Sequence, residues 1–544
     1  MEFTHKLPSI RCDGKINGIY NNPEIGYPSI LTTSNSELGE FIMGLRNIVQ
    51  ENRRLILIDN RVLVVNHNWI RDYTFVLFAS RHWEYEYRSF LNFILENQTE
   101  QGFFYELIKQ KDDGHWTFVN KDCYKLYDDD NLTLVRLEIE ADVEYLVVLF
   151  AEMIYKIDGD LDYIKNILPK LEKSINYMTS DEKRWDKEHE LVKRAFTIDT
   201  WDFTNEKNAN IDRTIHLDKM SIMHGDNSGV FAAMKALAFF RRKLGCVKEA
   251  DEWDKRAEDI RKNMFKYLWN GKFFIHQLHL NHDGVDNLEK IRLSLSNTYD
   301  INRGVTNSET SREIIKEYIK RRNETDAFSE WFTIDPPYEK FFTYEKGQYV
   351  NGAISPFTAG ELAKAAFKNG FEEYGYDIIK RMMKLYKKDK TIYFLYNRKT
   401  AENQESGGGP SAWGAASIIN AIDEGLAGIE DLDVRYNILG FSPRFAITEY
   451  KQLRYITGYE KSNITVDINY ELKECGMLYE IKASSSVIKA HILLPKNKKM
   501  EKLLINNKEY KINGIETIGE SSYVNFDYEK KNVENVKVEI YFCV

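Results

Sequence analysis

The sequence has few residues that cross-link or interrupt a chain, and it has no long apolar run. Of its 544 residues, 10 are proline and 5 are cysteine. The cysteines are odd in number and far apart, without the close spacing of a metal site or a redox pair, so we expect reduced thiols and no metal or other cofactor. No apolar run approaches a membrane span, and residues 1–10 lack the apolar segment of a signal peptide. We therefore expect a cytoplasmic protein that makes no contact with membranes.

An excess of positive charge is also absent. The chain has 75 Lys and Arg residues against 84 Asp and Glu residues, which gives a formal net charge of −9. A surface that binds nucleic acid or an anionic membrane needs clustered Lys and Arg. Nucleic acid is therefore not expected as a partner, and basic runs such as Lys387-Lys388 are interpreted as solvated faces.

Helical periodicity fills most of the first 430 residues. Apolar residues at three- and four-residue spacings predict a helix over 36–49, and alternation over 54–65 predicts a hairpin. Further helices are predicted over 72–81, 84–97, 133–156, 160–178, 183–194, 227–244, 248–267, 309–321, 358–369, 371–386 and 410–424. About a dozen helices in adjacent pairs favour a closed toroid of helical hairpins. An α-solenoid is the competing arrangement, but no fixed repeat period is visible.

The pattern changes after Gly428. Short alternating or β-branched segments, separated by Asn-Gly and Lys-Asn turns, predict a C-terminal antiparallel β-sandwich. We therefore expect a mainly α protein with three parts. They are an irregular lead-in over residues 1–35, a helical toroid over 36–430 that would be the catalytic domain, and a β-sandwich over 431–544.

Residues 197–205 place two carboxylates and a tryptophan in a turn-rich segment between helices. Asp202 follows Trp201, and an apolar ring beside a carboxyl group raises its pKa by desolvation, as a general acid requires. The alternative interpretation is that Asp202 caps a helix and Trp201 belongs to the core.

Residues 66–73 form a second polar and aromatic loop. Trp69 is suited to stack against a sugar, and an Asp72 held by Arg71 would stay ionised and accept hydrogen bonds from hydroxyl groups. A salt-bridged helix start is the competing interpretation. At the head of a later helix, His224 and Asp226 are candidates for the same cavity, although Asp226 also fits a helix cap.

Two more loops contain candidate site residues. In residues 344–357, Gln348, Tyr349 and Asn351 offer hydrogen-bonding side chains, beside glycines that permit close backbone approach. In residues 401–416, three glycines precede Pro410, which suits the first position of a helix, and Glu402 and Glu405 lie just upstream. One of these glutamates would polarise a water, or both belong to a capping turn, where negative charge is favoured.

Hydrolysis of a glycosidic bond needs a protonated carboxyl group and a second carboxylate, and for inversion the two lie ~6.5–9.5 Å apart. Asp202 and a later glutamate supply that pair if a toroid brings their loops together. The motifs, in order along the chain, are Trp69-Ile-Arg-Asp72, residues 136–142, Trp201-Asp202, residues 347–357 and residues 410–416.

Their order resembles that of the six-hairpin glycosidases, the (α/α)6-barrel clan that includes glucoamylases, glycoside hydrolase family 63, debranching glucosidases and α-L-rhamnosidases. The resemblance covers roughly residues 60–430 and implies an exo-acting, inverting hydrolase of an oligosaccharide or glycoside. It places Asp72 on hydroxyl groups of the −1 sugar, Asp202 as general acid and Trp413 in the helix after the general base. Either Glu402 or Glu405 is that base, and Glu405 is preferred because it adjoins the glycines.

Other functions stay open. A polysaccharide lyase would use Tyr349 or His224 as base, with Asn351 to neutralise a uronate. A glycoside phosphorylase would keep one carboxylic acid and replace the base by phosphate. A glycan-binding protein without activity would need the aromatic residues and neither carboxylate.

Overall fold

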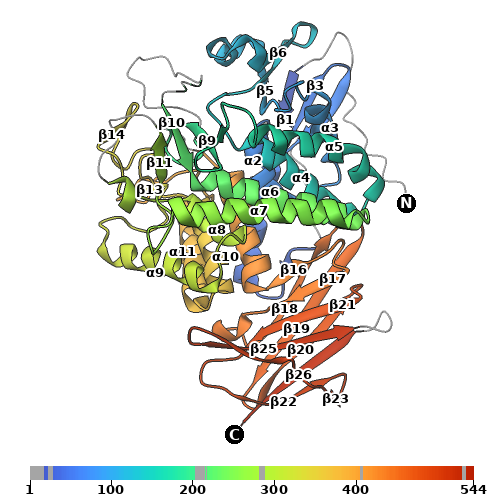
Figure 1. Ribbon diagram of the computed structural model, residues 1–544. Helices are drawn as coiled ribbons and strands as arrows, with labels where there is room; N and C mark the ends of the chain where they lie inside the picture. The colour runs from blue at the N-terminus through green and yellow to red at the C-terminus, as the bar shows by residue number, and fades with distance from the viewer. Residues whose placement is uncertain are drawn as a thin grey trace.

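The computed structural model describes residues 18–21, 29–201, 215, 217, 219–280, 288–404, 409–529 and 535–543. Figure 1 shows a helical body followed by a β domain, which lies below it in orange and red. In the described part of the chain, the α-helices are α1 (Ser36–Glu51), α2 (Ile70–Ser80), α3 (Arg88–Glu96), α4 (Val143–Asp158), α5 (Leu161–Met178), α6 (His224–Lys243), α7 (Val247–Tyr267), α8 (Ser296–Asn302), α9 (Ser308–Glu324), α10 (Pro356–Lys368), α11 (Glu372–Asp389) and α12 (Ala412–Asn420).

The even-numbered helices contact one another in cyclic order. Each of α2, α4, α6, α8 and α10 contacts the next, and α12 contacts both α10 and α2. Every residue of α12 is buried. In contrast, α7 buries one stripe, namely Ala250, Trp253, Ala257, Ile260 and Met264, which is the pattern of a helix that packs by one face. The even helices therefore form an inner layer, and the odd helices pack against it.

The small sheets lie in the connections that lead into the even helices. They are formed by β3 (Arg54–Ile58), β4 (Arg61–Val65), β5 (Leu107–Gln110), β6 (Tyr124–Tyr127), β7 (Leu132–Val135), β8 (Trp185–Asp186), β9 (Leu191–Ala195), β10 (Met220–Met223), β11 (Gln277–Leu280), β12 (Leu293–Ser294), β13 (Ile334–Asp335), β14 (Lys340–Phe341) and β15 (Tyr344–Glu345). The hairpin predicted over 54–65 is confirmed as β3 and β4. The elaborated loops thus stand at the N-terminal ends of the inner helices.

One predicted helix is wrong. Residues 183–194 contain β8 and most of β9. The Asn227 side chain accepts a hydrogen bond from the Val192 amide (2.8 Å) and donates one to the Val192 carbonyl (2.9 Å), and β9 pairs with β10. These distant partners satisfy the backbone groups that a local helix would otherwise pair. The helix predicted from residue 133 begins at Val143, because residues 132–135 form β7, and α8 was not predicted.

The C-terminal strands form two sheets. One sheet has the order β2-β18-β19-β20-β26-β22-β23, and the other has the order β16-β17-β21-β25-β24. The strands are β2 (Thr32–Thr33), β16 (Ile429–Asp431), β17 (Ile438–Phe441), β18 (Gln452–Tyr459), β19 (Ile464–Lys473), β20 (Gly476–Ala483), β21 (Val487–Leu493), β22 (Met500–Ile505), β23 (Lys508–Glu509), β24 (Gly514–Ile518), β25 (Ser521–Glu529) and β26 (Val536–Phe542). In the helical body, β1 (Gly18–Asn21) joins β3 and β4 in a three-stranded sheet.

The two C-terminal sheets share a core. Phe441 of one sheet meets Tyr479 of the other, with ring centroids 5.3 Å apart, and both residues are fully buried. The expectation of purely antiparallel strands is corrected at one place, because β17 and β21 run parallel. Three strands of the other sheet separate them in sequence, which supplies the long crossover that a parallel pair needs.

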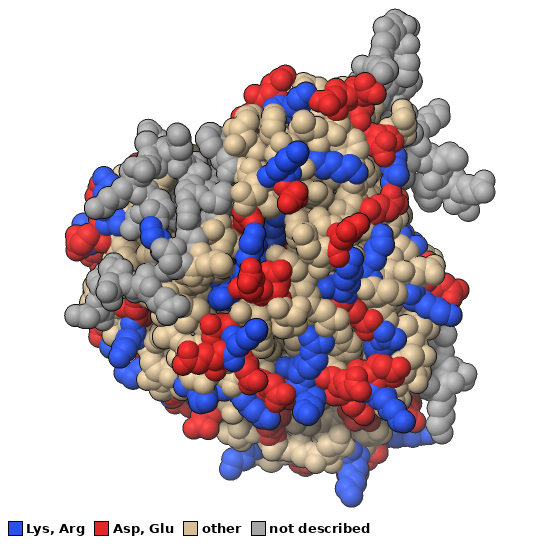
Figure 2. Space-filling view, turned by 45° about the horizontal axis from the view of Figure 1, so that its top comes forward, with Lys and Arg blue, Asp and Glu red and all other residues tan. Residues whose placement is uncertain are grey.

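The distribution of charge, the hydropathy of the helices and the state of the cysteines can be compared with the expectations from composition. Figure 2 shows Lys and Arg side chains interspersed with Asp and Glu over the face that it presents. Among the helices of the described residues, none is both long enough and apolar enough to cross a membrane. Cys123, Cys246, Cys475 and Cys543 are free thiols, and Cys12 lies outside the described residues.

Candidate active site

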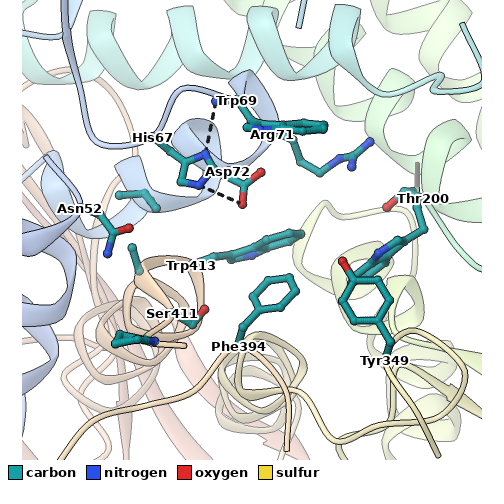
Figure 3. A pocket seen from close by; sticks show the side chains of 14 residues that line it. Asn52, His67, Trp69, Arg71, Asp72, Thr200, Tyr349, Phe394, Ser411 and Trp413 are labelled. Atoms are coloured by element: carbon teal, nitrogen blue, oxygen red, sulfur yellow. Dashed lines mark hydrogen bonds and ion pairs between the residues drawn. The ribbon is translucent and has the colours of Figure 1, made fainter. Parts of the chain in front are cut away.

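A cavity of about 320 Å³ opens at the N-terminal ends of α2 and α12. Figure 3 shows Arg71 and Asp72 on one side of it, Phe394 on the other and the Trp413 ring between them. The residues that line it are Asn52, His67, Trp69, Arg71, Asp72, Val76, Thr200, Trp201, Tyr349, Phe394, Pro410, Ser411, Ala412 and Trp413. Segments far apart in the sequence therefore meet here, and each of the four loops singled out above, residues 66–73, 197–205, 344–357 and 401–416, supplies at least one candidate residue to the cavity wall.

Trp413 is held in place by a stack of aromatic rings. Its ring lies parallel to Phe75 at 4.5 Å and nearly parallel to Phe357 at 4.4 Å, and its Nε1 donates to the Tyr299 hydroxyl at 3.0 Å. Ser411 caps the helix by accepting a hydrogen bond from the Gly414 amide at 2.9 Å. The expectation that Pro410 is the first helical residue is therefore wrong by two positions, because Ala412 begins the helix after the Ser411 cap.

Arg71 does not hold Asp72. Its guanidinium donates to both carboxylate oxygens of Asp142, at 2.5 and 2.9 Å, and it also pairs with Glu140 at 2.5 Å. Consecutive helical residues point in different directions, so Arg71 and Asp72 face different surroundings. Among the described residues, the ionisable side chain nearest to Asp72 is His67, with Nε2 3.9 Å from Oδ1. The Asp72 carboxylate is therefore available to a ligand.

A buried group of acids stands behind Arg71. Burial alone would raise the pKa of Asp142, but Arg71 outweighs it and lowers the pKa of this carboxyl group. Burial also raises the pKa of Glu106 well above its ordinary value, and the neighbouring Glu140 adds to the shift. Burial and the neighbouring acid thus favour the neutral form of Glu106. Residues 136–142 were predicted only as one motif of the ordered set, and the orientation of Arg71 by Glu140 and Asp142 was not predicted.

The turn at residues 198–201 is anchored from two sides. Asp199 accepts hydrogen bonds from the Ser296 amide and hydroxyl, at 3.1 and 2.5 Å, and its own amide donates to His276. The buried Arg194 donates to the Trp201 carbonyl and pairs with Asp226 at 3.4 Å. This anchoring presents Thr200 and Trp201 to the cavity. Asp202, the next residue, lies outside the described residues.

His224 and Asp226 do not line the cavity. His224 is fully buried, with Nδ1 2.6 Å from Asp300 and Nε2 2.8 Å from the Ser294 hydroxyl. Asp226 lies in the first turn of α6, whose N-cap is Met223, so it is no cap. Burial raises the pKa of Asp226 to about 6, although Arg194 opposes that shift.

The loop before α10 brings one of its three candidates to the cavity. Tyr349 lines it, and its ring meets that of Trp201 edge-on at 5.7 Å. The exposed Gln348 accepts a hydrogen bond from the Glu345 amide within its own turn. Asn351 is fully buried and bonds to the backbone of Tyr338. Gln348 and Asn351 therefore shape the loop that presents Tyr349.

Glu402 is exposed and is not part of the cavity lining, whereas Glu405 lies outside the described residues. Between them, Gln404 is buried and accepts a hydrogen bond from the Tyr349 amide at 2.6 Å. Its side-chain amide also donates to the Gly347 carbonyl at 2.6 Å. Gln404 thus ties the chain just before Glu405 to a loop that lines the cavity.

Some lining residues escaped the sequence analysis. His67 and Thr200 stand inside loops that were singled out, and their polar side chains beside Trp69 and Trp201 were a usable signal. Asn52 follows the last residue of α1, and Phe394 lies in the connection after α11. No sequence pattern around Asn52 distinguishes it from a helix-capping residue. Likewise, none around Phe394 distinguishes it from an aromatic residue of the core.

Solved structures share this architecture. No protein-family model and no curated protein sequence matches the chain. The α-L-rhamnosidase from Dictyoglumus thermophilum superposes with a TM-score of 0.59 at 12% identity, over 96% of this chain and 50% of the other. The Streptomyces avermitilis α-L-rhamnosidase complexed with L-rhamnose gives 0.55 at 11% identity, over 94% and 42%. The glycoside hydrolase family 63 mannosylglycerate hydrolase from Thermus thermophilus gives 0.51 at 14% identity, over 70% and 99%.

This chain has the fold of these glycosidases. The resemblance to the six-hairpin clan, drawn from short motifs, is confirmed at the level of the fold. The chain spans half or less of the rhamnosidase chains that it matches. Because the identities are low, the activity has to be argued from the cavity itself.

Proposed function

We propose that the protein is an inverting glycoside hydrolase that removes a neutral sugar residue from the end of a glycan or glycoside. The observation that carries this proposal is the meeting of two loops at one cavity. Trp201, directly before Asp202, lines that cavity, and so do Pro410 and Ser411, which follow Glu405 by a few residues. Hydrolysis with inversion requires two carboxyl groups at one pocket, and each of these two loops carries a candidate for one of them in its sequence.

The proposal includes a closed (α/α)6 toroid. It is supported by the cyclic contacts of α2, α4, α6, α8, α10 and α12 and by the odd helices packed against them. A closed ring brings the loops before its inner helices to one end, which explains how residues from distant parts of the sequence line one cavity.

In the proposed reaction, Asp202 donates its proton to the glycosidic oxygen while Glu405 removes a proton from the attacking water. Glu402 is the weaker candidate for the base because it is exposed and away from the cavity. Asp72 would accept hydrogen bonds from hydroxyl groups of the sugar, and Trp69, Trp201 and Trp413 supply ring surfaces for its C–H groups.

The size and charge of the cavity support a single neutral sugar. Its volume of about 320 Å³ lies at the lower end of the range for ligand pockets, ~300–1,000 Å³. Arg71 is the only Lys or Arg among the described lining residues, and its guanidinium already binds Asp142 and Glu140. The described wall thus offers no uncommitted cation for a uronate or for phosphate, which disfavours the lyase and the phosphorylase.

The test is turnover of a panel of aryl glycosides and oligosaccharides, with the anomer of the first product followed by NMR. We expect inversion. Asp202→Asn should lower kcat by ~10²–10⁴-fold while sugar affinity stays within about tenfold, because the amide removes mainly the transferable proton.

A matched pair of variants identifies the base. Glu405→Gln should lower kcat by at least ~10²-fold, and Glu402→Gln should change it by less than about threefold. Unchanged turnover in Asp202→Asn and Glu405→Gln, with sugar affinity preserved, would instead indicate a glycan-binding protein. An unsaturated product, or turnover that requires phosphate, would indicate the lyase or the phosphorylase.

A further inference from the structure

A second cavity, of about 460 Å³, lies at the opposite ends of the same inner helices. Its wall comes from α2, α4, α6, α8 and α10, mostly from the second half of each, from the end of α12 and from β16 of the C-terminal domain. The first cavity meets α2 at Arg71, Asp72 and Val76, whereas the second meets it at Thr74, Phe75 and Phe78 and extends to Arg81. The proposed hydrolase reaction uses none of the residues in this second wall.

One aromatic layer separates the two cavities. Trp413 lines the first cavity, while Phe75 and Tyr299 line the second. Trp413 stacks on Phe75 and donates to the Tyr299 hydroxyl. Because these rings fill the space between the cavities, the second cavity is a separate compartment with its own lining.

Cations slightly outnumber carboxylates among the described residues that line the second cavity. The cations are Arg81, Lys156, Lys235, Arg303, Lys364 and Lys368, and the acids are Glu152, Glu361, Glu424, Glu430 and Asp431. Arg81 and Lys364 both pair with the single carboxylate of Glu424, at 2.6 and 2.5 Å. Arg303 has no carboxylate within 4.0 Å among the described residues, and it donates instead to the Gly225 carbonyl and the Ser228 hydroxyl at 2.9 Å. Glu361 accepts a hydrogen bond from the side-chain amide of Asn302 at 2.6 Å. Lys156 pairs with Glu152 and Lys368 pairs with Glu430, so six cations of the described wall face five carboxylates.

Two amide groups in this wall each have one polar atom without a partner. Asn420 is 1% exposed; its Oδ1 accepts from Arg81, and its Nδ2 has no hydrogen-bond partner among the described residues. Asn302 donates to Glu361, and its buried Oδ1 has no partner in the same part of the chain. A buried polar atom left unpaired destabilises a fold. The wall thus holds one donor and one acceptor that the described protein groups leave unsatisfied.

Apolar surface completes the wall, because Phe75, Phe78, Phe239 and Tyr299 also line the cavity. We propose that this cavity binds a polyol of monosaccharide size that carries one anionic group. Arg303 and Lys364 would bind the anionic group, Asn302 and Asn420 would bind hydroxyl groups, and the aromatic rings would cover C–H groups. The proposal does not depend on the hydrolase activity of the first cavity.

Isothermal titration calorimetry of the full chain tests it. Glucose 6-phosphate and gluconate are the probes, with glucose and inorganic phosphate as partial mimics. We expect at least one of the two probes to bind with Kd of about 1 mM or tighter, and both mimics to bind at least about tenfold more weakly. Equal binding of either mimic, or no binding of both probes, overturns the proposal.

Two variants test whether the probe binds in the second cavity. Ala236→Trp should fill the cavity from α6, because Ala236 lines it and is only 2% exposed. Arg303→Gln removes the cation and keeps hydrogen-bonding atoms. Each should weaken probe binding at least about tenfold, a loss of ~1.4 kcal/mol. Arg256→Gln, an identical change on the outer helix α7, is the control and should leave Kd unchanged.

Circular dichroism shows whether each variant is folded, and one folded variant is sufficient for the test. Binding that survives in a folded Ala236→Trp or Arg303→Gln protein, or that is lost in Asp72→Asn at the first cavity, overturns the assignment to the second cavity.

Discussion

The two ends of the inner helices differ in charge. Carboxylates stand in first turns, with Asp72 in α2, Glu144 in α4 and Asp226 in α6. Cations stand at the other ends, in last turns or at C-caps, and they are Arg81, Lys156, Arg241, Arg242, Lys243, Arg303 and Lys368. This distribution follows the helix dipole, which favours negative charge at N-termini and positive charge at C-termini. The two ends of this inner layer of helices therefore differ in the chemistry that they offer.

The difference bears on what each cavity can bind. At the N-terminal end, Arg71 is committed to Asp142 and Glu140, so the wall keeps an acceptor, Asp72, and no uncommitted cation among its described residues. At the C-terminal end, Arg303 has no carboxylate partner in the described part of the chain. One end suits the hydroxyl groups of a neutral sugar, and the other suits an anion.

Breaking the buried pair at the N-terminal end should have the largest effect. Arg71→Met leaves the carboxyl groups of Asp142 and Glu140 buried without their cation. Removing one partner of a buried ion pair costs about 3–5 kcal/mol, so the free energy of unfolding from denaturant titration should fall by that amount. The exposed pair of Arg61 and Glu96 supplies the control, since Arg61→Met should cost less than about 1 kcal/mol. Equal losses in both variants would contradict this account of Arg71.

At the N-terminal end, Asp72→Asn tests whether Asp72 contributes to activity without contributing to stability. In the described part of the chain, the Asp72 carboxylate has only His67 as an ion-pair partner, at 3.9 Å, so the free energy of unfolding should hardly change. A hydrogen bond to a charged group contributes ~1.5–3 kcal/mol, so kcat/KM for the best aryl glycoside should fall by ~10–100-fold. Asp259→Asn, on the outer surface of α7, should leave kcat/KM unchanged. Full activity of Asp72→Asn would remove Asp72 from the sugar site.

The smallest effect is expected at Asp423, a buried acid that follows the C-terminal end of α12. Asp423 is fully buried beside His82, and burial raises the pKa of Asp423 to about 7, against the opposing effect of Arg81. The unfolded carboxyl group has a pKa of ~3.9. The folded state therefore binds more protons between about pH 4 and pH 7, and its stability falls as pH rises through that range.

Asparagine mimics the protonated form of Asp423. Asp423→Asn should therefore gain about 1–2 kcal/mol over the wild type at pH 8 and less than that at pH 5, measured by thermal unfolding. Asp467→Asn, at an exposed pair with Arg454 on β19, should show no such pH dependence. A gain that does not grow with pH would show that Asp423 does not titrate in this range.

Long, capped amphipathic segments were predicted well. The helices expected over 160–178 and 248–267 are α5 and α7. In α5 the Asp160 side chain caps the Tyr163 amide at 2.9 Å, a contact between neighbours in sequence. Such elements follow from the sequence because the interactions that start them and the stripe that buries them lie within a few turns.

Side-chain partners were predicted poorly. Arg71 was expected beside Asp72 but pairs with Asp142, and His224 was expected in the cavity but is buried against Asp300. Each true partner lies in a distant part of the chain. No local pattern distinguishes such a pair from an exposed polar residue, because the choice depends on which helices pack together.

By itself, the sequence determined the helical body, the β domain after it and the loops in which polar and aromatic residues gather, because periodicity and turn residues act locally. Tertiary structure alone decided which of those residues face the cavity. Trp69, Asp72, Trp201, Tyr349 and Trp413 line it, while Gln348, Asn351 and His224 support loops or fill the core. The physical reason is that the burial and pairing of a polar side chain depend on the elements packed around it, and those elements come from distant parts of the chain.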